Sequence, residues 1–200
     1  MAGLLDRVGI DSGRFVDLGA GAVSLLPSSL SVRKLDLVRP DGVEGTFVQG
    51  SAEALPFGDA TLDGIGLFDV LEHLDEPGQC LKEVGRVVRS GGVVLVTVPA
   101  YQWLWSPHDD LVDHKRRYTP DALRQELEAA GMSVSWLSGF YGFLMGPAAA
   151  RKVLSLESPM SMPPPALNRM LTSLAARSVR RSLRRSTGAG LSLAAVAAVA

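Results

Sequence analysis

The stretch Phe15–Gly21 limits the possible folds of this chain more than any other part of it. Phe15, Val16 and Leu18 form a short apolar run, which ends in Gly19-Ala20-Gly21. A buried strand followed by a Gly-x-Gly turn is typical of open α/β sheets, in which the turn brings backbone close to a ligand. Glycine is needed there because a Cβ atom would obstruct both the turn and the ligand. The stretch predicts the first strand of such a sheet.

Apolar strands and amphipathic helices alternate along the rest of the chain. Leu81, Val84 and Val88 recur at helical spacing, and Thr119-Pro120-Asp121 is a strong helix start. This alternation predicts a doubly wound, mostly parallel α/β sheet. The expected strands are 15–18, 32–38, 46–48, 62–68, 93–98, 132–137 and 191–199, and the expected helices are 2–8, 76–88 and 120–130. The helix after Gly21 should be short or irregular because of Pro27.

Length and pattern favour a single domain over residues 1–200. The pattern changes after Gly142, where several prolines punctuate two helical pieces. Because the last strand has to return to the sheet, we expect residues 142–188 to form a helical insertion between the last two strands.

Composition excludes several classes of protein. A net charge of −1 gives no general attraction to nucleic acid or membranes. The single cysteine, Cys80, cannot form an internal disulfide, and the longest apolar tract, 191–200, is far shorter than the roughly 20 residues of a membrane span. The first residues include Asp6 and lack a long apolar run, so no signal peptide is expected. These observations predict a cytoplasmic protein.

Five short motifs in a fixed order resemble one family. The chain resembles the class I S-adenosylmethionine-dependent methyltransferases, of the broad type-11 group. The matching pieces are Val16–Gly21, Leu35–Leu37, Ala52–Phe57, Asp69–Leu74 and Arg86–Gly92. The resemblance covers about residues 14–140 and implies a seven-stranded, Rossmann-like sheet with an antiparallel last strand.

The resemblance implies a pocket for S-adenosyl-L-methionine. Asp17 would lie near the ammonium or ribose end of the cofactor, and Gly19 and Gly21 would let the backbone approach its methionine part. Asp36, at the end of the second strand, would accept hydrogen bonds from the ribose hydroxyls.

Two further pairs of residues complete the implied pocket. Ser51 and Ala52 would lie at the adenine, with Ser51 standing where the family commonly has Asp. Phe68 and Asp69 would lie beside the transferring methyl group.

Departures from the family pattern leave alternatives open. Val23 replaces the usual third glycine of the turn, so a catalytically degenerate binding module or partner subunit is the second interpretation. A site for NAD is a third, but Ser24 stands where the dinucleotide pattern requires glycine or alanine.

Candidate catalytic residues follow the fourth and fifth strands. His73 and His108 are candidate general bases for a hydroxyl acceptor. Alternatively, Asp69, Glu72, His73 and His108 have donor types and a spacing that could hold a divalent ion, a role not favoured over a structural one. The acceptor is expected to be a small molecule or lipid-like, and its identity stays open.

Two segments near these residues carry many charges. The loop 101–118 is long and aromatic; its cations Lys115, Arg116 and Arg117 could meet an anionic substrate or pair with neighbouring acids. The basic helix expected at 167–185 has six arginines and no acid. It could cover the site or touch anionic lipid, and it lacks the interleaved aromatic residues of a specific nucleic-acid site. No feature predicts the oligomeric state.

Overall fold

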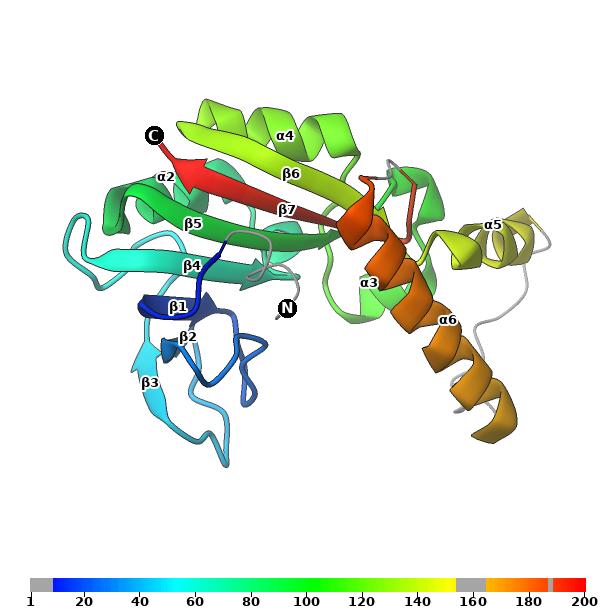
Figure 1. The fold of residues 1–200 in the computed structure, drawn as a ribbon, viewed down its shortest axis with the longest axis horizontal. Coiled ribbons are helices and arrows are strands. Elements are labelled where there is room, and N and C mark those ends of the chain that lie inside the picture. Colours follow the sequence, from blue (N-terminus) through cyan, green and yellow to red (C-terminus); the bar gives the residue numbers. More distant parts are fainter. Residues whose placement is uncertain (1–8, 154–164, 187–188) are drawn as a thin grey trace.

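Seven strands form one mixed sheet in the order β3-β2-β1-β4-β5-β7-β6, as Figure 1 shows. The computed structural model describes residues 9–153, 165–186 and 189–200. All neighbouring strands are parallel except β7, which runs antiparallel to both β5 and β6. The strands are β1 (Arg14–Leu18), β2 (Ser31–Asp36), β3 (Thr46–Gln49), β4 (Leu62–Phe68), β5 (Val88–Pro99), β6 (Met132–Phe140) and β7 (Ser192–Val199). The predicted Rossmann-like sheet with its antiparallel last strand is confirmed.

Short helices connect these strands. The α-helices are α2 (Pro77–Val87), α3 (Pro107–Leu111), α4 (Pro120–Ala129), α5 (Met145–Val153) and α6 (Pro165–Arg184), and the 3₁₀ helices are η1 (Leu71–His73), η2 (Gln102–Leu104) and η3 (Gly142–Leu144). The predicted start of α4 is confirmed, because the Thr119 side chain accepts a hydrogen bond from the backbone N–H of Ala122. The helix predicted at 2–8 lies outside the described residues.

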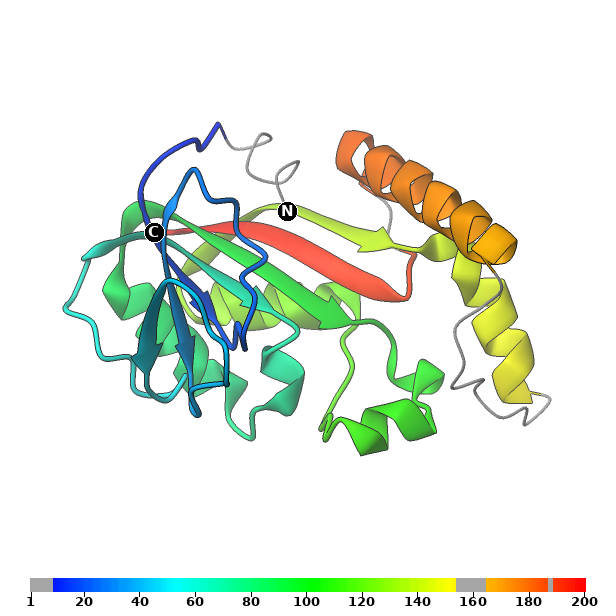
Figure 2. The same cartoon turned by 90° about the horizontal axis from the view of Figure 1, so that it is seen from below.

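The two faces of the sheet are covered differently. Val94 and Val96 of β5 pack with α2 and α4, whereas Leu95, which points the other way, belongs to a second apolar cluster. Val179 and Leu183 of α6 pack against that second cluster. Figure 2 shows α6 on the opposite side of the sheet from α2 and α4.

The segment between β1 and β2 contains no helix. Residues 19–30 form turns and bends, so the short or irregular helix predicted after Gly21 is absent. Leu26 and Leu30 are buried and cover part of the second apolar cluster in place of a helix.

In the sequence, helices α5 and α6 both follow β6 and precede β7. The first half of α6 projects away from the sheet in Figure 1. Within the described part of the chain, no helix has the length and apolar character needed to cross a membrane.

Candidate cofactor and acceptor site

A cavity of about 530 Å³ opens at the carboxyl ends of β1, β2, β3 and β4. In open α/β sheets, ligands bind at this edge, where the strand order reverses between β1 and β4. Among the residues that line it are Leu18, Gly19, Asp36, Ser51, Ala52, Asp69 and His73. Six of the ten predicted site residues (Gly19, Asp36, Ser51, Ala52, Asp69 and His73) therefore surround one space.

Gly19 begins the turn that forms one wall of the cavity. Its φ of +68° is in the left-handed region, and a Cβ atom there would lie 2.8 Å from Cγ2 of Val70. Its N–H donates to the carbonyl of Leu35 at 2.7 Å. Only glycine combines this backbone conformation with this close contact.

Asp36 lies at the end of β2 and faces the glycine turn. Oδ2 accepts a hydrogen bond from Gly21 N at 3.1 Å, and Oδ1 accepts one from Leu37 N at 2.8 Å. A carboxylate oxygen has two acceptor positions, so each oxygen keeps one for a further donor. The carboxylate is thus oriented by backbone and still able to accept from a diol such as ribose, so the residues present fit the cofactor that the resemblance implies.

Asp17 lies beneath the turn and does not line the cavity. It is 1% exposed and accepts hydrogen bonds from Ser24 Oγ and Leu25 N. Burial raises the pKa of this carboxyl, although these hydrogen bonds oppose the effect. The structure therefore places Asp17 as the acceptor that holds the 24–26 turn, not at the ammonium or ribose position that the resemblance implied.

Two more predicted residues lie away from the cavity lining. Phe68 points to the opposite side of the sheet from Leu67 because side chains alternate along β4, and it packs in the second apolar cluster. Gly21 contributes its N–H to Asp36 but does not line the cavity itself.

A half-buried network holds the segment that follows Ser51 and Ala52. The Arg86 guanidinium donates to the carbonyls of Leu55 and Phe57, and it also pairs with Glu83. Glu83 in turn accepts from Leu55 N at 2.9 Å. The segment folds against Arg86 and Glu83 of α2 and leaves both side chains half-buried.

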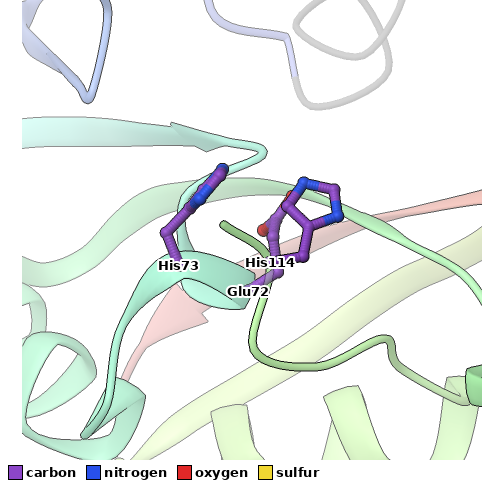
Figure 3. Close-up of side chains that lie close together, drawn as sticks. All are labelled: Glu72, His73 and His114. Carbon is purple, nitrogen blue, oxygen red and sulfur yellow. The ribbon is translucent and has the colours of Figure 1, made fainter. Parts of the chain in front are cut away.

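Glu72, His73 and His114 form a cluster next to the cavity. One ligand atom from each lies within 4.8 Å of the others, and the two imidazole rings meet edge to face with centroids 4.8 Å apart. Figure 3 shows the Glu72 carboxylate beside His114, with His73 on the other side. His108, a predicted catalytic residue and ligand, is instead exposed on α3 and is not part of this cluster.

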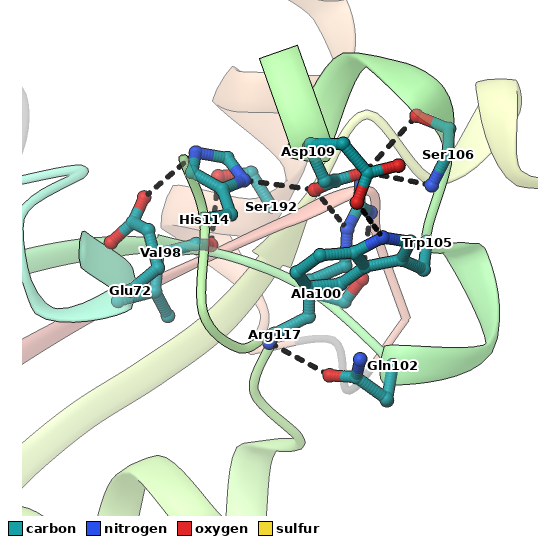
Figure 4. Close-up of polar contacts among 11 residues, drawn as sticks. Glu72, Val98, Ala100, Gln102, Trp105, Ser106, Asp109, His114, Arg117 and Ser192 are labelled. Atoms are coloured by element: carbon teal, nitrogen blue, oxygen red, sulfur yellow. Dashed lines mark hydrogen bonds and ion pairs between the residues drawn. The ribbon is translucent and has the colours of Figure 1, made fainter. Parts of the chain in front are cut away.

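Asp109 joins His114 to the rest of the loop 101–118. It is fully buried and accepts from His114 Nδ1 at 2.8 Å, from Arg117 Nε at 2.7 Å and from Ser106 N at 2.8 Å, as Figure 4 shows. Burial would raise the pKa of Asp109, but these hydrogen bonds outweigh it and hold the pKa well below its usual range. Asp109 is therefore an ionised acceptor, so His114 Nδ1 carries the hydrogen and Nε2 faces Glu72.

Glu72 is a buried carboxyl group that lacks hydrogen-bond donors among the described residues. Its side chain is fully buried, and neither carboxylate oxygen accepts a hydrogen bond from the described residues. Among the described residues, the group within ion-pair distance of Glu72 is His114, whose Nε2 lies 3.9 Å from Oε1. Burial is the main reason that the pKa of Glu72 rises to about 8.

The cations of the loop are held by the protein itself. Arg117 pairs with Asp109, Lys115 pairs with Asp75, and Arg116 donates to the carbonyls of Leu74 and Asp75. Internal pairing therefore explains these three residues, of which Lys115 alone also lines the cavity. These contacts dock the end of the loop on η1 and bring His114 to Glu72.

The basic helix does not cover this cavity. None of the described α6 residues lines it. Five arginines instead line a separate concave surface, and these are Arg177, Arg180, Arg181, Arg184 and Arg185.

Comparison with known proteins agrees with the fold. Residues 9–96 match a family model described as a methyltransferase domain. A probable S-adenosylmethionine-dependent methyltransferase of Mycolicibacterium smegmatis is 36% identical over 95 residues, which are 46% of this chain and 37% of that protein. A demethylmenaquinone methyltransferase of Renibacterium salmoninarum is 33% identical over 88 residues, 44% of this chain and 36% of that protein. The matches span little more than a third of the length of these curated relatives.

The likeness to solved structures extends over nearly the whole chain. An S-adenosylmethionine-dependent methyltransferase from Methanosarcina mazei superposes with a TM-score of 0.61 at 14% identity, covering 98% of this chain and 96% of that one. At this identity the likeness concerns the fold. The family match covers β1, β2 and β4, at whose carboxyl ends Gly19, Asp36 and Asp69 lie. In residues 9–96 the chain is therefore similar to a methyltransferase domain, and over nearly its whole length it has the fold of S-adenosylmethionine-dependent methyltransferases.

Proposed function

We propose that this protein transfers a methyl group from S-adenosylmethionine to a small, lipid-like acceptor. The observation that carries the proposal is the position of Asp36, which faces the Gly19 turn across a 530 Å³ cavity with its carboxylate oriented by two backbone N–H groups. Transfer from a sulfonium depends largely on proximity, orientation and exclusion of water. His73, which lines the same cavity, is the candidate group beside the acceptor.

Two observations support a lipid-like acceptor. The relative from Renibacterium salmoninarum is named for demethylmenaquinone, a lipid-soluble quinone. In addition, α5 and α6 follow the carboxyl end of β6, so the basic helix projects from the same edge of the sheet that holds the cavity. Contact of its arginines with anionic lipid would bring the cavity near a membrane surface, with each basic residue contributing about 1 kcal/mol.

The second interpretation, a binding module that has lost catalysis, rests on the turn after β1. Val23 is 73% exposed, and no helix follows the glycines, so no helix N-terminus faces the cavity there. A cytoplasmic location stays a prediction from composition and the single buried cysteine.

Calorimetric titration with S-adenosylhomocysteine separates the two interpretations at the first step. The enzyme proposal requires saturable binding, and the absence of binding at about 1 mM ligand, equivalent to a binding free energy weaker than about −4 kcal/mol, would contradict it. Formation of S-adenosylhomocysteine from S-adenosylmethionine in the presence of a prenylated naphthohydroquinone would then support the proposed acceptor class. Binding without turnover on any acceptor would favour the module.

Lipid contact is tested by flotation with vesicles of phosphatidylcholine that contain about a third phosphatidylglycerol. Each arginine removed from α6, as in Arg180→Ala or Arg184→Ala, should weaken binding about fivefold, which corresponds to about 1 kcal/mol. Arg124→Ala is the matched control because Arg124 lies on α4, on the other face of the sheet. Equal losses in all three variants, or no binding of the unaltered protein, would exclude specific contact through α6.

A further inference from the structure

We propose that Glu72, His73 and His114 bind a divalent transition-metal ion. Side chains from two parts of the chain 41 residues apart converge here, and one ligand atom from each lies within 4.8 Å of the other two. The cluster combines one carboxylate with two imidazoles, a donor set typical of first-row transition metals. An ion at this place is distinct from the methyl donor, whose cavity lies next to the cluster and shares only His73 with it.

The first argument is the state of the Glu72 carboxylate. Both of its oxygens are buried and accept no hydrogen bond from the described residues. A carboxylate without hydrogen bonds is costly to bury unless it is paired or coordinates a metal. The Arg117 guanidinium is already engaged with Asp109 through two nitrogens and donates no hydrogen bond to Glu72.

The second argument is the separation between the two inner ligand atoms. His114 Nε2 lies 3.9 Å from Glu72 Oε1, which is too long for a hydrogen bond. Metal–nitrogen and metal–oxygen bonds in proteins are about 2.0–2.2 Å, so an ion between the two atoms would reach both. His73 closes the third side, with its ring 4.8 Å from that of His114.

The third argument is the orientation of His114. Its Nδ1 donates to Asp109, an acceptor that Arg117 and Ser106 hold in place. Metal-binding histidines commonly donate their second ring N–H to a carboxylate, which fixes the other nitrogen as the ligand. His114 has this arrangement. The backbone N–H of the next residue, Lys115, donates to the Glu72 carbonyl at 2.7 Å and so holds this part of the loop against η1.

An ion here would also define the acceptor more closely, a step that rests on the function proposed above. It would lie beside the methyl-donor cavity and bind an acceptor oxygen, lowering the pKa of a hydroxyl group. The site therefore points to O-methylation of a hydroxyl-bearing acceptor.

The test uses the metal alone and the whole chain, without methyl donor. Protein treated with a chelator is titrated with Co²⁺, whose visible absorption reports nitrogen and carboxylate ligands, and then with Zn²⁺ as competitor. We expect one ion per chain, displaced by Zn²⁺ and not by Mg²⁺, which prefers an all-oxygen site. Glu72→Gln and His114→Ala should weaken Co²⁺ binding at least tenfold, and His108→Ala is the matched control because His108 lies outside the cluster on α3.

A second readout guards against loss of the fold. Glu72→Gln removes a buried carboxyl group whose oxygens accept no hydrogen bond, so without metal this variant should melt at or above the temperature of the unaltered protein, while only the latter gains stability from Zn²⁺. Absence of Co²⁺ binding by the unaltered protein at about 1 mM would overturn the proposal. Equal loss of binding in His108→Ala and His114→Ala would also overturn it. Because S-adenosylhomocysteine binding is measured separately, failure of the metal site and failure of the methyltransferase proposal are distinguishable.

Discussion

The backbone N–H of Gly21 donates a hydrogen bond of 3.1 Å to Oδ2 of Asp36, joining the turn after β1 to the end of β2. Lys34 strengthens the same connection, because its ammonium group donates to the carbonyl of Ala22 at 2.7 Å. The turn therefore has a defined position although no helix follows it. Asp36 is both a candidate ligand for the cofactor and the anchor of the turn beside it.

Replacement of Asp36 by Ala should weaken binding of S-adenosylhomocysteine tenfold or more. The change removes an acceptor for the ribose hydroxyls, and one charge-assisted hydrogen bond corresponds to about 1.4 kcal/mol or more. Calorimetric titration measures the effect. Asp41→Ala is the matched control, because Asp41 is an exposed acid that does not line the cavity. Equal affinity of the two variants would show that Asp36 does not contact the cofactor.

Gly19→Ala should destabilise the protein more than Gly21→Ala. Both glycines have positive φ, so each alanine adds about 1–2 kcal/mol of backbone strain. Only the Cβ atom at position 19 meets a neighbour, Cγ2 of Val70 at 2.8 Å. Urea unfolding should therefore show an additional loss of about 1–3 kcal/mol for Gly19→Ala.

The double variant Gly19→Ala/Val70→Ala tests the cause of that additional loss. If the contact with Val70 is responsible, the two changes together should cost less than the sum of the single changes, by at least about 0.5 kcal/mol. Strict additivity would assign the loss to the backbone alone.

Arg86→Lys should loosen the segment that follows Ser51 and Ala52. A lysine ammonium has one nitrogen and cannot serve the two carbonyls and the Glu83 carboxylate that the guanidinium reaches. We expect a lower free energy of unfolding and severalfold weaker binding of S-adenosylhomocysteine. Lys82→Ala, on the exposed side of α2, should change neither quantity.

Asp63 should contribute a part of the stability that disappears in acid. Hydrogen bonds from the Arg14 backbone N–H and the Arg89 side chain lower the pKa of this carboxyl from 3.8 to about 2. A group whose pKa is lowered by folding stabilises the protein above its unfolded pKa, and this contribution is lost as the pH falls through the folded pKa. The relevant window is therefore pH 4 to 2.

Urea unfolding of Asp63→Asn across that window checks the direction. The variant should be about 1 kcal/mol less stable than the unaltered protein at pH 7, and the difference should vanish near pH 2. Asp41→Asn, at an exposed site, should show no such convergence. A difference that grows as the pH falls would contradict this account.

The sequence by itself determined the sheet and one side of the cavity. Strand β4 has the predicted bounds, 62–68, with Leu62, Ile65, Leu67 and Phe68 as its apolar residues. Gly19, Asp36, Ser51 and Ala52 line one cavity, since parallel strands bring their carboxyl ends together at one edge of the sheet. The bounds of β5 were less predictable: it begins at Val88, not Val93, because pairing with Leu62 extends it past the two glycines.

Only the tertiary structure decided which side chains at that edge meet. Asp17 and Phe68 follow from the pattern as strand-end residues, but what they contact depends on the fold: Asp17 meets the turn at 24–26, and Phe68 packs in the second apolar cluster. His114 and His108 have the same residue type in the same loop, and no local pattern distinguishes them. The choice between them comes from Asp109, which lies beneath the loop and directs His114 toward Glu72. The approach of His114 to Glu72 joins residues distant in the sequence, and it depends on the packing of the whole fold.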